Sequence, residues 1–443
     1  MNRLFFSLLI VWAARADQKP SAVSSRNPPN IILILADDLG YADLGTYGDK
    51  INQTPHLDRL AKEGIRFTDF HSNGANCSPT RAAILTGQYQ QRWGIEGALG
   101  EGAKGLPQNS ITIAERLREA GYATGLMGKW HLGYKPDNSP LRHGFDEFVG
   151  HLHGATDYIS HVDRYGRMDW WHDEKKVHEE GHNTALITKH SVRFIEKHRE
   201  RPFFLFVSHS AIHFPWQTRD SPAHRKPGNR YESSKGKLGP HVGTPIQPIV
   251  RGMIEELDDS VGEIVSALRQ HDLGKRTLVF FTSDNGGIVR MKGVSTRDRI
   301  SDNTPWRGQK HGLYEGGHRV PAVAWWPGEI KPGRSDATTM TFDLFPTFLA
   351  IAGGQTFRTD GVDLSSHLQE QTPLSPRLTF WRNGKSKAVR WKNWKLVRNH
   401  EASFELYNLD QSPDEKPKFN LIDARRSVAD DLLNRLADWE KQF

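Results

Sequence analysis

Cysteine is nearly absent from this chain of 443 residues, which contains a single one, Cys77. One cysteine cannot form an internal disulfide, so the fold must be stabilised by its hydrophobic core. The sequence also lacks long basic runs and low-complexity arms, although 59 lysines and arginines exceed 52 acidic residues and give a net charge of +7. This diffuse positive balance argues against nucleic-acid binding and suits anionic substrates.

Long hydrophobic runs are absent too. The N-terminus carries Arg3, an apolar stretch from Leu4 to Trp12, and then Ala14-Arg15-Ala16. This order predicts a secretory signal peptide over residues 1–16 with cleavage after Ala16. Its apolar stretch is shorter than the roughly 20 residues that a membrane span needs, and so is every later one. We therefore expect a secreted or periplasmic protein without a stable membrane span.

Short aliphatic runs alternate with amphipathic helical patterns through most of the chain. Runs of this kind predict buried strands at Asn30–Ala36, Tyr122–Gly128, Phe203–His209, Leu278–Ser283 and Val320–Trp326. Helical stripes follow at Ile113–Ala120, Leu186–Lys197, Met253–Leu268 and Phe342–Ala352. The alternation predicts a doubly wound α/β sheet covered on both faces, which we assign to a first, larger domain over residues 26–355.

The pattern changes after Gly353-Gly354. Short strands rich in tryptophan and arginine are expected at Leu378–Arg382, Ala388–Trp391 and Trp394–Val397, with a closing helix from about Ser427. We interpret residues 356–443 as a smaller α+β subdomain with an antiparallel sheet.

Cys77 lies in the segment Cys77-Ser78-Pro79-Thr80-Arg81. Pro79 fits the first turn of a helix, Ser78 fits the N-cap, and Arg81 then lies on the same face as Cys77. A helix N-terminus beside a guanidinium is suited to an anion. Taken alone, however, an isolated cysteine is most often a small buried hydrophobic residue.

Carboxylates and an amide follow two of the expected strands. Asp37-Asp38 comes after the first strand, and Asp284-Asn285 follows the strand at Leu278. Ligands of open α/β sheets bind at the carboxyl ends of strands, and this all-oxygen set is the one calcium prefers. Each pair alone is equally consistent with ordinary turn or cap chemistry, whereas the two together favour a metal.

Cationic side chains form a second group after other strands. Lys129 and His131 follow the strand at Tyr122, two residues apart on one side of an extended segment. His213 follows the strand ending at His209, and Lys310 precedes Glu315-Gly316-Gly317-His318-Arg319. In a chain with 21 histidines, a single histidine or loop lysine is most often a surface residue.

The run Cys-x-Pro-x-Arg, followed by Thr86-Gly87, resembles the signature of the type I sulfatases, and the resemblance covers nearly the whole chain. It implies an alkaline-phosphatase-like mixed sheet, conversion of Cys77 to Cα-formylglycine, and one calcium ion. A formylglycine-generating or anaerobic sulfatase-maturating enzyme is then the partner during biogenesis. One position departs from the family: Gln88 replaces the usual arginine after Thr-Gly.

The resemblance also implies a role for each candidate residue. Asp37, Asp38, Asp284, Asn285 and the modified Cys77 surround the calcium, and Asp284 accepts the proton of the attacking hydroxyl. Arg81, Lys129 and Lys310 neutralise the sulfate. His213 donates a proton to the leaving oxygen, and His131 takes the proton whose loss expels sulfate.

The substrate is expected to be a sulfated glycan of the galactan, carrageenan or glycosaminoglycan type. The segment His151–His172 mixes polar groups with aromatic residues, and its Asp157-Tyr158-x-x-His161 run resembles that of arylsulfatase A-like carbohydrate sulfatases. Asp157, Tyr158, His161 and Arg319 are the candidate sugar contacts. A solvated loop anchored by tryptophan explains this composition equally well.

Three other functions remain open. A two-zinc phosphoesterase of the same superfamily carries an Asp-His pair where this chain has Asp284-Asn285, and an amide is a poor zinc ligand. A formylglycine-dependent phosphonate or phosphate ester hydrolase has the same nucleophile motif. A glycan-binding homologue without turnover is the outcome if Cys77 stays unmodified.

Overall fold

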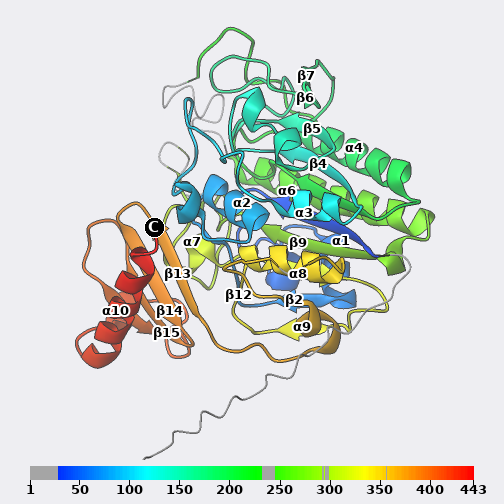
Figure 1. Ribbon diagram of the computed structural model, residues 1–443. Coiled ribbons are helices and arrows are strands. Elements are labelled where there is room, and N and C mark those ends of the chain that lie inside the picture. Colours follow the sequence, from blue (N-terminus) through cyan, green and yellow to red (C-terminus); the bar gives the residue numbers. More distant parts are fainter. Residues whose placement is uncertain (1–27, 232–244, 292–293, 295–298, 356) are drawn as a thin grey trace, which may run out of the picture.

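A large mixed sheet forms the centre of the molecule (Figure 1). The computed structural model describes residues 28–231, 245–291, 294, 299–355 and 357–443. Within these residues the sheet has the order β11-β2-β10-β9-β1-β8-β4-β5-β6-β7. The signal peptide expected over residues 1–16 lies outside the described residues. No described helix is long and apolar enough to cross a membrane.

The strands at the middle of this sheet are those that the aliphatic runs predict. The central ones are β1 (Asn30–Ala36), β8 (Phe203–Ser208), β4 (Ala123–Lys129) and β9 (Thr277–Ser283). They run parallel, with β1 paired to both β8 and β9, and all four are buried throughout. Burial on both faces explains why their sequences are continuously apolar.

The outer strands make the sheet mixed. β10 (Ala322–Trp325) pairs antiparallel with β9 and with β2 (Ile65–Phe67), and β11 (Gly333–Ser335) is parallel to β2. At the other edge β5 (Glu147–His151) is followed by the short strands β6 (Trp171–His172) and β7 (Lys175–Lys176).

Helices cover both faces of the sheet, as its apolar strands require. α1 (Pro55–Glu63), α4 (Asn183–His198) and α6 (Gln247–Gln270) pack on one face against alternate β1 residues such as Ile32 and Ile34. α2 (Cys77–Thr86), α3 (Ile113–Glu119) and α8 (Leu344–Ile351) cover the opposite face with Ile31 and Leu33. The expected doubly wound mixed sheet is therefore confirmed.

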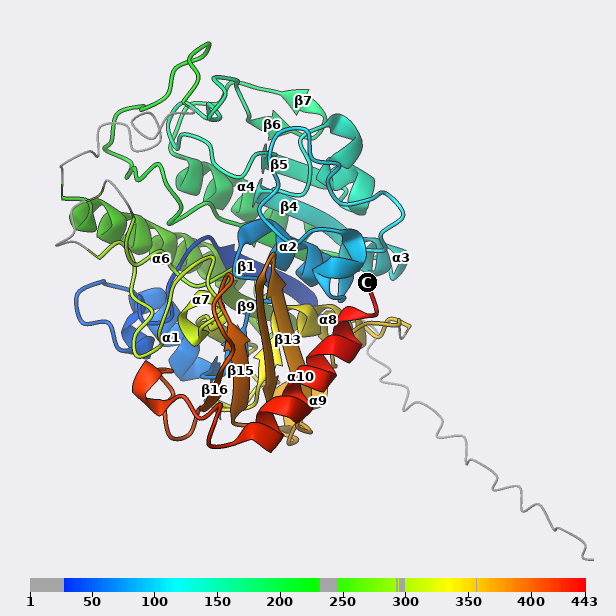
Figure 2. The same ribbon diagram turned by 90° about the vertical axis from the view of Figure 1, so that its left-hand side faces the viewer.

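A second, antiparallel sheet lies beside the first near the C-terminus (Figure 2). It comprises β13 (Leu378–Asn383), β14 (Ser386–Trp391), β15 (Trp394–Arg398) and β16 (Glu405–Asn408), with α10 (Arg426–Glu440) packed on it. Its core includes Ala83 and Tyr89 from α2 and the turn after it. At its edge, Asn383 Nδ2 donates to the backbone oxygen of His311, directly beside Lys310.

Candidate active site

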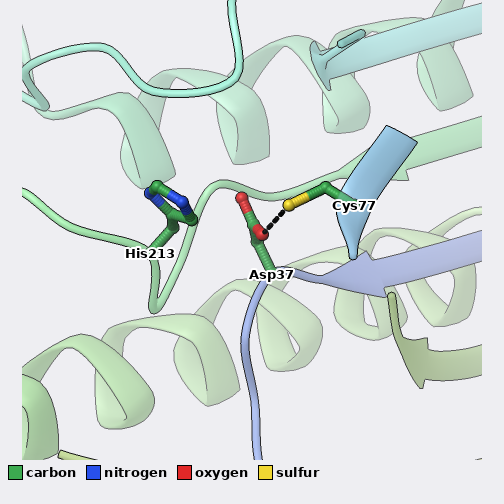
Figure 3. A group of neighbouring side chains, drawn as sticks. All are labelled: Asp37, Cys77 and His213. Carbon is green, nitrogen blue, oxygen red and sulfur yellow. Dashed lines mark hydrogen bonds between the residues drawn. The ribbon is translucent and has the colours of Figure 1, made fainter. Parts of the chain in front are cut away.

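Polar side chains from four neighbouring strands meet at the carboxyl edge of the large sheet. Asp37 and Asp38 follow β1, Lys129 ends β4, and Asp284 follows β9. Figure 3 shows Cys77 at the start of α2 pointing toward Asp37, with His213 on the loop after β8 facing the same point. The topology thus collects residues that are far apart in the sequence.

The local fold of the cysteine segment differs from the sequence expectation by two residues. Asn76 occupies the N-cap position and Cys77 is the first residue of α2, so Ser78 is not the N-cap. The hydroxyl of Ser78 instead accepts a hydrogen bond from the backbone N–H of Leu99 at 3.0 Å. The helix ends at Gly87, whose φ of 66° closes it in the left-handed conformation.

The Cys77 thiol is buried among charged groups. Sγ donates a 3.6 Å hydrogen bond to Asp37 Oδ1, and Lys310 Nζ lies 3.3 Å from it. Burial raises the pKa of the Cys77 thiol to about 12, against the opposing influence of Lys129 and Lys310. The unmodified side chain is therefore a neutral thiol and a weak nucleophile.

The acidic side chains have the composition of a cation site. Ligand atoms of Asp37, Asp38, Cys77 and Asp284 all lie within 4.8 Å of one another. Burial, assisted by the charge of Asp284, raises the pKa of Asp37 to about 7. Two buried oxygens, Asp38 Oδ2 and Asn285 Oδ1, have no hydrogen-bond partner. Unpartnered carboxylate and amide oxygens beside crowded negative charges fit a hard cation such as calcium.

Two lysines approach this acidic group from the other side. Lys129 Nζ lies 2.5 Å from Asp37 Oδ2, and Lys310 Nζ lies 2.5 Å from Asp38 Oδ1. Although burial favours the neutral amine, Asp38 and Cys77 raise the pKa of Lys310, which stays charged. Three carboxylates and three cations balance, so a bound divalent cation leaves an excess of positive charge for an anion.

Arg81 holds the framework of the site together. Its Nε and Nη2 donate to Asp284 Oδ2 at 3.1 and 2.8 Å, and its Nη1 donates to Ser208 Oγ at 2.6 Å and to the Lys129 carbonyl. Most of its N–H groups are therefore engaged by protein atoms. The two charge-assisted hydrogen bonds to one oxygen fix the position of Asp284 Oδ2.

His213 faces the carboxylates with one particular nitrogen. Its Nδ1 lies 2.7 Å from the Phe214 carbonyl, which can only accept, so Nδ1 carries a proton. Its Nε2 lies 3.8 Å from Asp38 Oδ2. Burial and the charge of Lys310 hold the pKa of His213 well below its usual range. Nε2 is consequently the ring nitrogen that is free to take up or release a proton.

His131 is oriented by a backbone carbonyl on another loop. Its φ of 59° ends the extended conformation after β4, so it does not share one side of a strand with Lys129 as expected. Nε2 lies 3.1 Å from the Leu99 carbonyl and is the protonated nitrogen, whereas the buried Nδ1 has no partner. Burial, with Lys129 and Arg81, holds its pKa well below 6.5. His131 is thus a neutral base with Nδ1 free.

The four expected sugar contacts have internal partners in the structure. Asp157 accepts hydrogen bonds from four backbone N–H groups, and the Tyr158 hydroxyl donates to the Ser210 and His213 carbonyls. His161 is buried and stacks on Trp170 at 4.6 Å. Arg319 pairs with Asp69 at 3.2 Å and Glu315 at 3.1 Å. These side chains shape the loops, and this geometry does not present them to a sugar.

Two residues that the sequence did not single out support the site. Ser208 at the end of β8 accepts from Arg81 and donates to the Lys129 carbonyl at 2.7 Å. The Tyr134 hydroxyl donates to the same Leu99 carbonyl that orients His131. Only the strand-end position of Ser208 signals its role. No local pattern marks Tyr134, because its partner comes from a distant loop.

Comparisons with known proteins show which sequences are similar to this chain. The family model described as "Sulfatase" matches residues 29–354. N-acetylgalactosamine-6-sulfatase of Mus musculus is 34% identical over 400 residues, covering 84% of this chain and 72% of the relative. Arylsulfatase A of Bos taurus is 33% identical over 485 residues, covering 95% and 88%.

Solved structures of other proteins share the fold of this chain. A structure described as Ps i-CgsB superimposes with a TM-score of 0.80 at 29% identity and covers 93% of each chain. The same protein has also been solved in complex with k-i-k-neocarrahexaose. A phosphonate monoester hydrolase of Agrobacterium radiobacter, at 20% identity and a TM-score of 0.65, shares the fold.

Proposed function

Because this chain belongs to the sulfatase family, we propose that it hydrolyses sulfate monoesters on a sulfated carbohydrate and releases inorganic sulfate. The observation that carries the proposal is the buried meeting of Cys77 with three carboxylates and three cations at one sheet edge. Relatives named as carbohydrate sulfatases, and a structural neighbour solved with a carrageenan oligosaccharide, support a glycan substrate.

Cys77 is proposed to act after conversion to formylglycine, because the bare thiol is neutral at physiological pH. Asp37, Asp38, Asp284 and Asn285, together with residue 77, would hold one calcium ion. The formylglycine would supply a hydrated aldehyde. The calcium ion would act as a Lewis acid that lowers the pKa of a hydroxyl group on this hydrate. Arg81 keeps the Asp284 carboxylate in place through two hydrogen bonds to its Oδ2.

Lys129 and Lys310 are proposed to bind the nonbridging oxygens of the sulfate. Each ammonium is buried and lies 2.5 Å from a carboxylate, so its position is fixed before substrate arrives. With the charges of Asp37 and Asp38 offset by a bound cation, Lys129 and Lys310 would have positive charge available for an anion. Arg81 adds positive charge at the same point, but its N–H groups serve Asp284 and Ser208.

The two histidines divide the proton transfers between them. His213 holds its Nδ1 proton on the Phe214 carbonyl, takes up a second proton at Nε2 when the negatively charged substrate binds, and delivers that proton to the leaving oxygen. His131 holds its Nε2 proton on the Leu99 carbonyl and accepts a proton at Nδ1 when sulfate is released. The negative charge of bound substrate raises the proton affinity of both rings.

The proposal includes export and maturation. We propose that the chain is secreted or periplasmic and that a formylglycine-generating or anaerobic sulfatase-maturating enzyme modifies Cys77. The order of Arg3, an apolar stretch from Leu4 to Trp12 and Ala14-Arg15-Ala16 supports this proposal.

Sulfate release from a panel of galactan, carrageenan and glycosaminoglycan oligosaccharides tests the function. Cys77→Ala should abolish release, and Lys310→Met should lower kcat/KM by about 10²–10³-fold because one fixed cation is lost. Exposed Lys331 provides the matched control, and Lys331→Met should retain full activity.

The panel also contains phosphonate and phosphate monoesters. Faster turnover of those esters than of every sulfated saccharide would favour the phosphonate hydrolase alternative. Undiminished sulfate release by Cys77→Ala would refute the nucleophile.

A further inference from the structure

Three side chains with metal-ligating atoms converge at the edge of the large sheet, on elements that contribute nothing to the site described above. His172 ends β6, Glu179 lies in the segment between β7 and α4, and His190 is on α4. Figures 1 and 2 both place β6 and β7 at the outer end of the sheet, away from α2. The ligand atoms of all three lie within 4.8 Å of one another.

The geometry of this group is close to that of a metal site. His172 Nε2 and His190 Nε2 each lie 2.9 Å from the same oxygen, Glu179 Oε2. Zinc at its usual bond lengths separates tetrahedral ligands by about 3.3 Å, so a few tenths of an ångström of opening would admit the ion. Two imidazoles and one carboxylate leave the fourth position for water, a familiar zinc arrangement.

The arrangement without a metal is crowded. Glu179 Oε2 faces three N–H donors at once, because the Trp170 indole also donates to it at 3.1 Å. An ion bound between the rings would replace two of these contacts and leave the indole in place.

Local sequence alone would suggest a different metal site. Residues 178–182 read His-Glu-Glu-Gly-His, a spacing that binds zinc when it lies on a helix. Here the segment is not helical, and Gly181 has a φ of 135°. His182 turns away, with Nε2 3.1 Å from the Gln217 carbonyl. Glu179 therefore meets histidines from β6 and α4 rather than those beside it in sequence.

A second group, His71, Glu315 and His318, has similar spacing but already contains a cation. Lys395 Nζ lies 2.8 Å from Glu315 Oε1 and 3.1 Å from His318 Nε2, and its side chain is fully buried. Lys189, which contacts Glu179 Oε1 at 2.9 Å, has a side chain that is 63% exposed. This lysine can move into solvent when a metal binds, whereas Lys395 cannot.

We propose that His172, Glu179 and His190 bind one zinc ion in addition to the proposed calcium. The ion would tie β6 and the segment before α4 to that helix. It would also fix Trp170, whose ring stacks on His161 at 4.6 Å and so supports the loop that carries Tyr158. Its binding does not depend on the proposed sulfatase activity.

Zinc titration of the calcium-saturated full chain tests this proposal, with stoichiometry and affinity measured by calorimetry. We expect one saturable zinc per chain and an unfolding midpoint raised by a few degrees. His190→Ala and His172→Ala should each weaken binding by at least about 100-fold, since even indirect partners of ligands contribute 10- to 100-fold. His178→Ala, a change in the same segment, is the matched control and should bind zinc normally.

Cobalt provides a second readout that does not depend on stability. Cobalt substitution should give the intense visible bands of four-coordinate Co²⁺, and these should be lost in Glu179→Gln. The proposal is overturned if zinc does not saturate at one per chain, or if the His172 and His190 variants bind it as tightly as the wild-type chain. Equal weakening in His178→Ala would also contradict it.

Discussion

Two buried charge clusters of the same composition have opposite properties. Each contains three carboxylates, three cationic side chains and two histidines. The active-site cluster consists of Asp37, Asp38, Asp284, Arg81, Lys129, Lys310, His131 and His213. The subdomain cluster, between the two sheets, consists of Asp69, Glu315, Glu415, Arg319, Arg390, Lys395, His71 and His318.

The subdomain cluster joins the two sheets through well-matched ion pairs. Arg390 on β14 donates to both oxygens of Asp69 at 2.8 and 2.9 Å. Lys395 on β15 lies 2.8 Å from Glu315 and 3.0 Å from Glu415. Glu415 Oε1 is the one carboxylate oxygen of this cluster without a hydrogen bond, and Lys395 Nζ lies 3.0 Å from it. The cluster has no evident need for a further ion, and its role is to hold the structure together.

The active-site cluster contains as many charges of each sign as the subdomain cluster, but several of its polar atoms lack hydrogen-bond partners. Asp38 Oδ2 and Asn285 Oδ1 are buried without hydrogen-bond partners, and so is Nδ1 of His131. Asp38 and His131 also have left-handed backbone conformations, with φ of 64° and 59°, whereas in the subdomain cluster only Glu415 does, with φ of 47°. Strain and unpartnered polar atoms destabilise a fold unless something binds there. The comparison indicates that one cluster is built for stability and the other for ligands.

The largest expected effect is on stability, at the subdomain cluster. Lys395→Met leaves Glu315 and Glu415 buried together without their shared cation, which should lower the free energy of unfolding by about 3–5 kcal/mol. Chemical denaturation measures this loss. Lys385→Met, which removes an exposed partner of Glu401, should cost well under about 1 kcal/mol. Equal costs for the two variants would mean that the subdomain cluster does not hold the sheets together.

A smaller effect is expected when calcium is removed. Calcium at 100 times its dissociation constant should stabilise the protein by about 2.7 kcal/mol, because it binds only the folded site. Thermal unfolding with calcium or with a chelator measures this increment. Asn285→Ala removes the unpartnered amide oxygen and should reduce it. Glu415→Gln, in the other cluster, should leave it unchanged, and calcium-independent unfolding of the wild-type chain would contradict the comparison.

The smallest effect concerns pH. Burial and Lys395 hold the pKa of His318 well below 6.5, so the ring is neutral when folded but takes up a proton when unfolded in acid. The unfolded state binds more protons below pH 6.5, and this contribution to stability is therefore lost as the pH falls. Its slope is at most about 1.4 kcal/mol per pH unit. His318→Gln should flatten the pH dependence of the denaturation midpoint, and an unchanged slope would show that this ring does not contribute.

Much of the fold could be predicted because buried parallel strands leave a strong local signal. β1 has the bounds expected from its aliphatic run, and the stripe from Met253 to Leu268 lies within α6. Ligands of α/β sheets bind at the carboxyl ends of parallel strands, so the sequence also predicts that Asp37 and Asp284 lie close together. In the structure their ligand atoms lie within 4.8 Å of each other. Local pattern and topology were sufficient for these elements.

The remaining features depend on contacts between distant segments. Ser78 has N-cap chemistry, but Leu99 uses its hydroxyl and Asn76 begins the helix. Arg319 directly follows the short helix α7 (Glu315–His318), and in the subdomain cluster it pairs with Asp69 at 3.2 Å. A polar residue in a loop serves a ligand or the fold equally well until its partners are known.

The most direct test of the account is peptide mass spectrometry of the segment around Cys77, purified from the native host. Conversion to formylglycine lowers the mass of residue 77 by about 18 Da, and the same preparation should release sulfate from a sulfated glycan. The peptide also covers Gln88, where the sequence departs from the family. We predict that the modified peptide is the major form in active enzyme. An unmodified thiol in an active preparation would contradict the assignment of Cys77 as the precursor of the nucleophile.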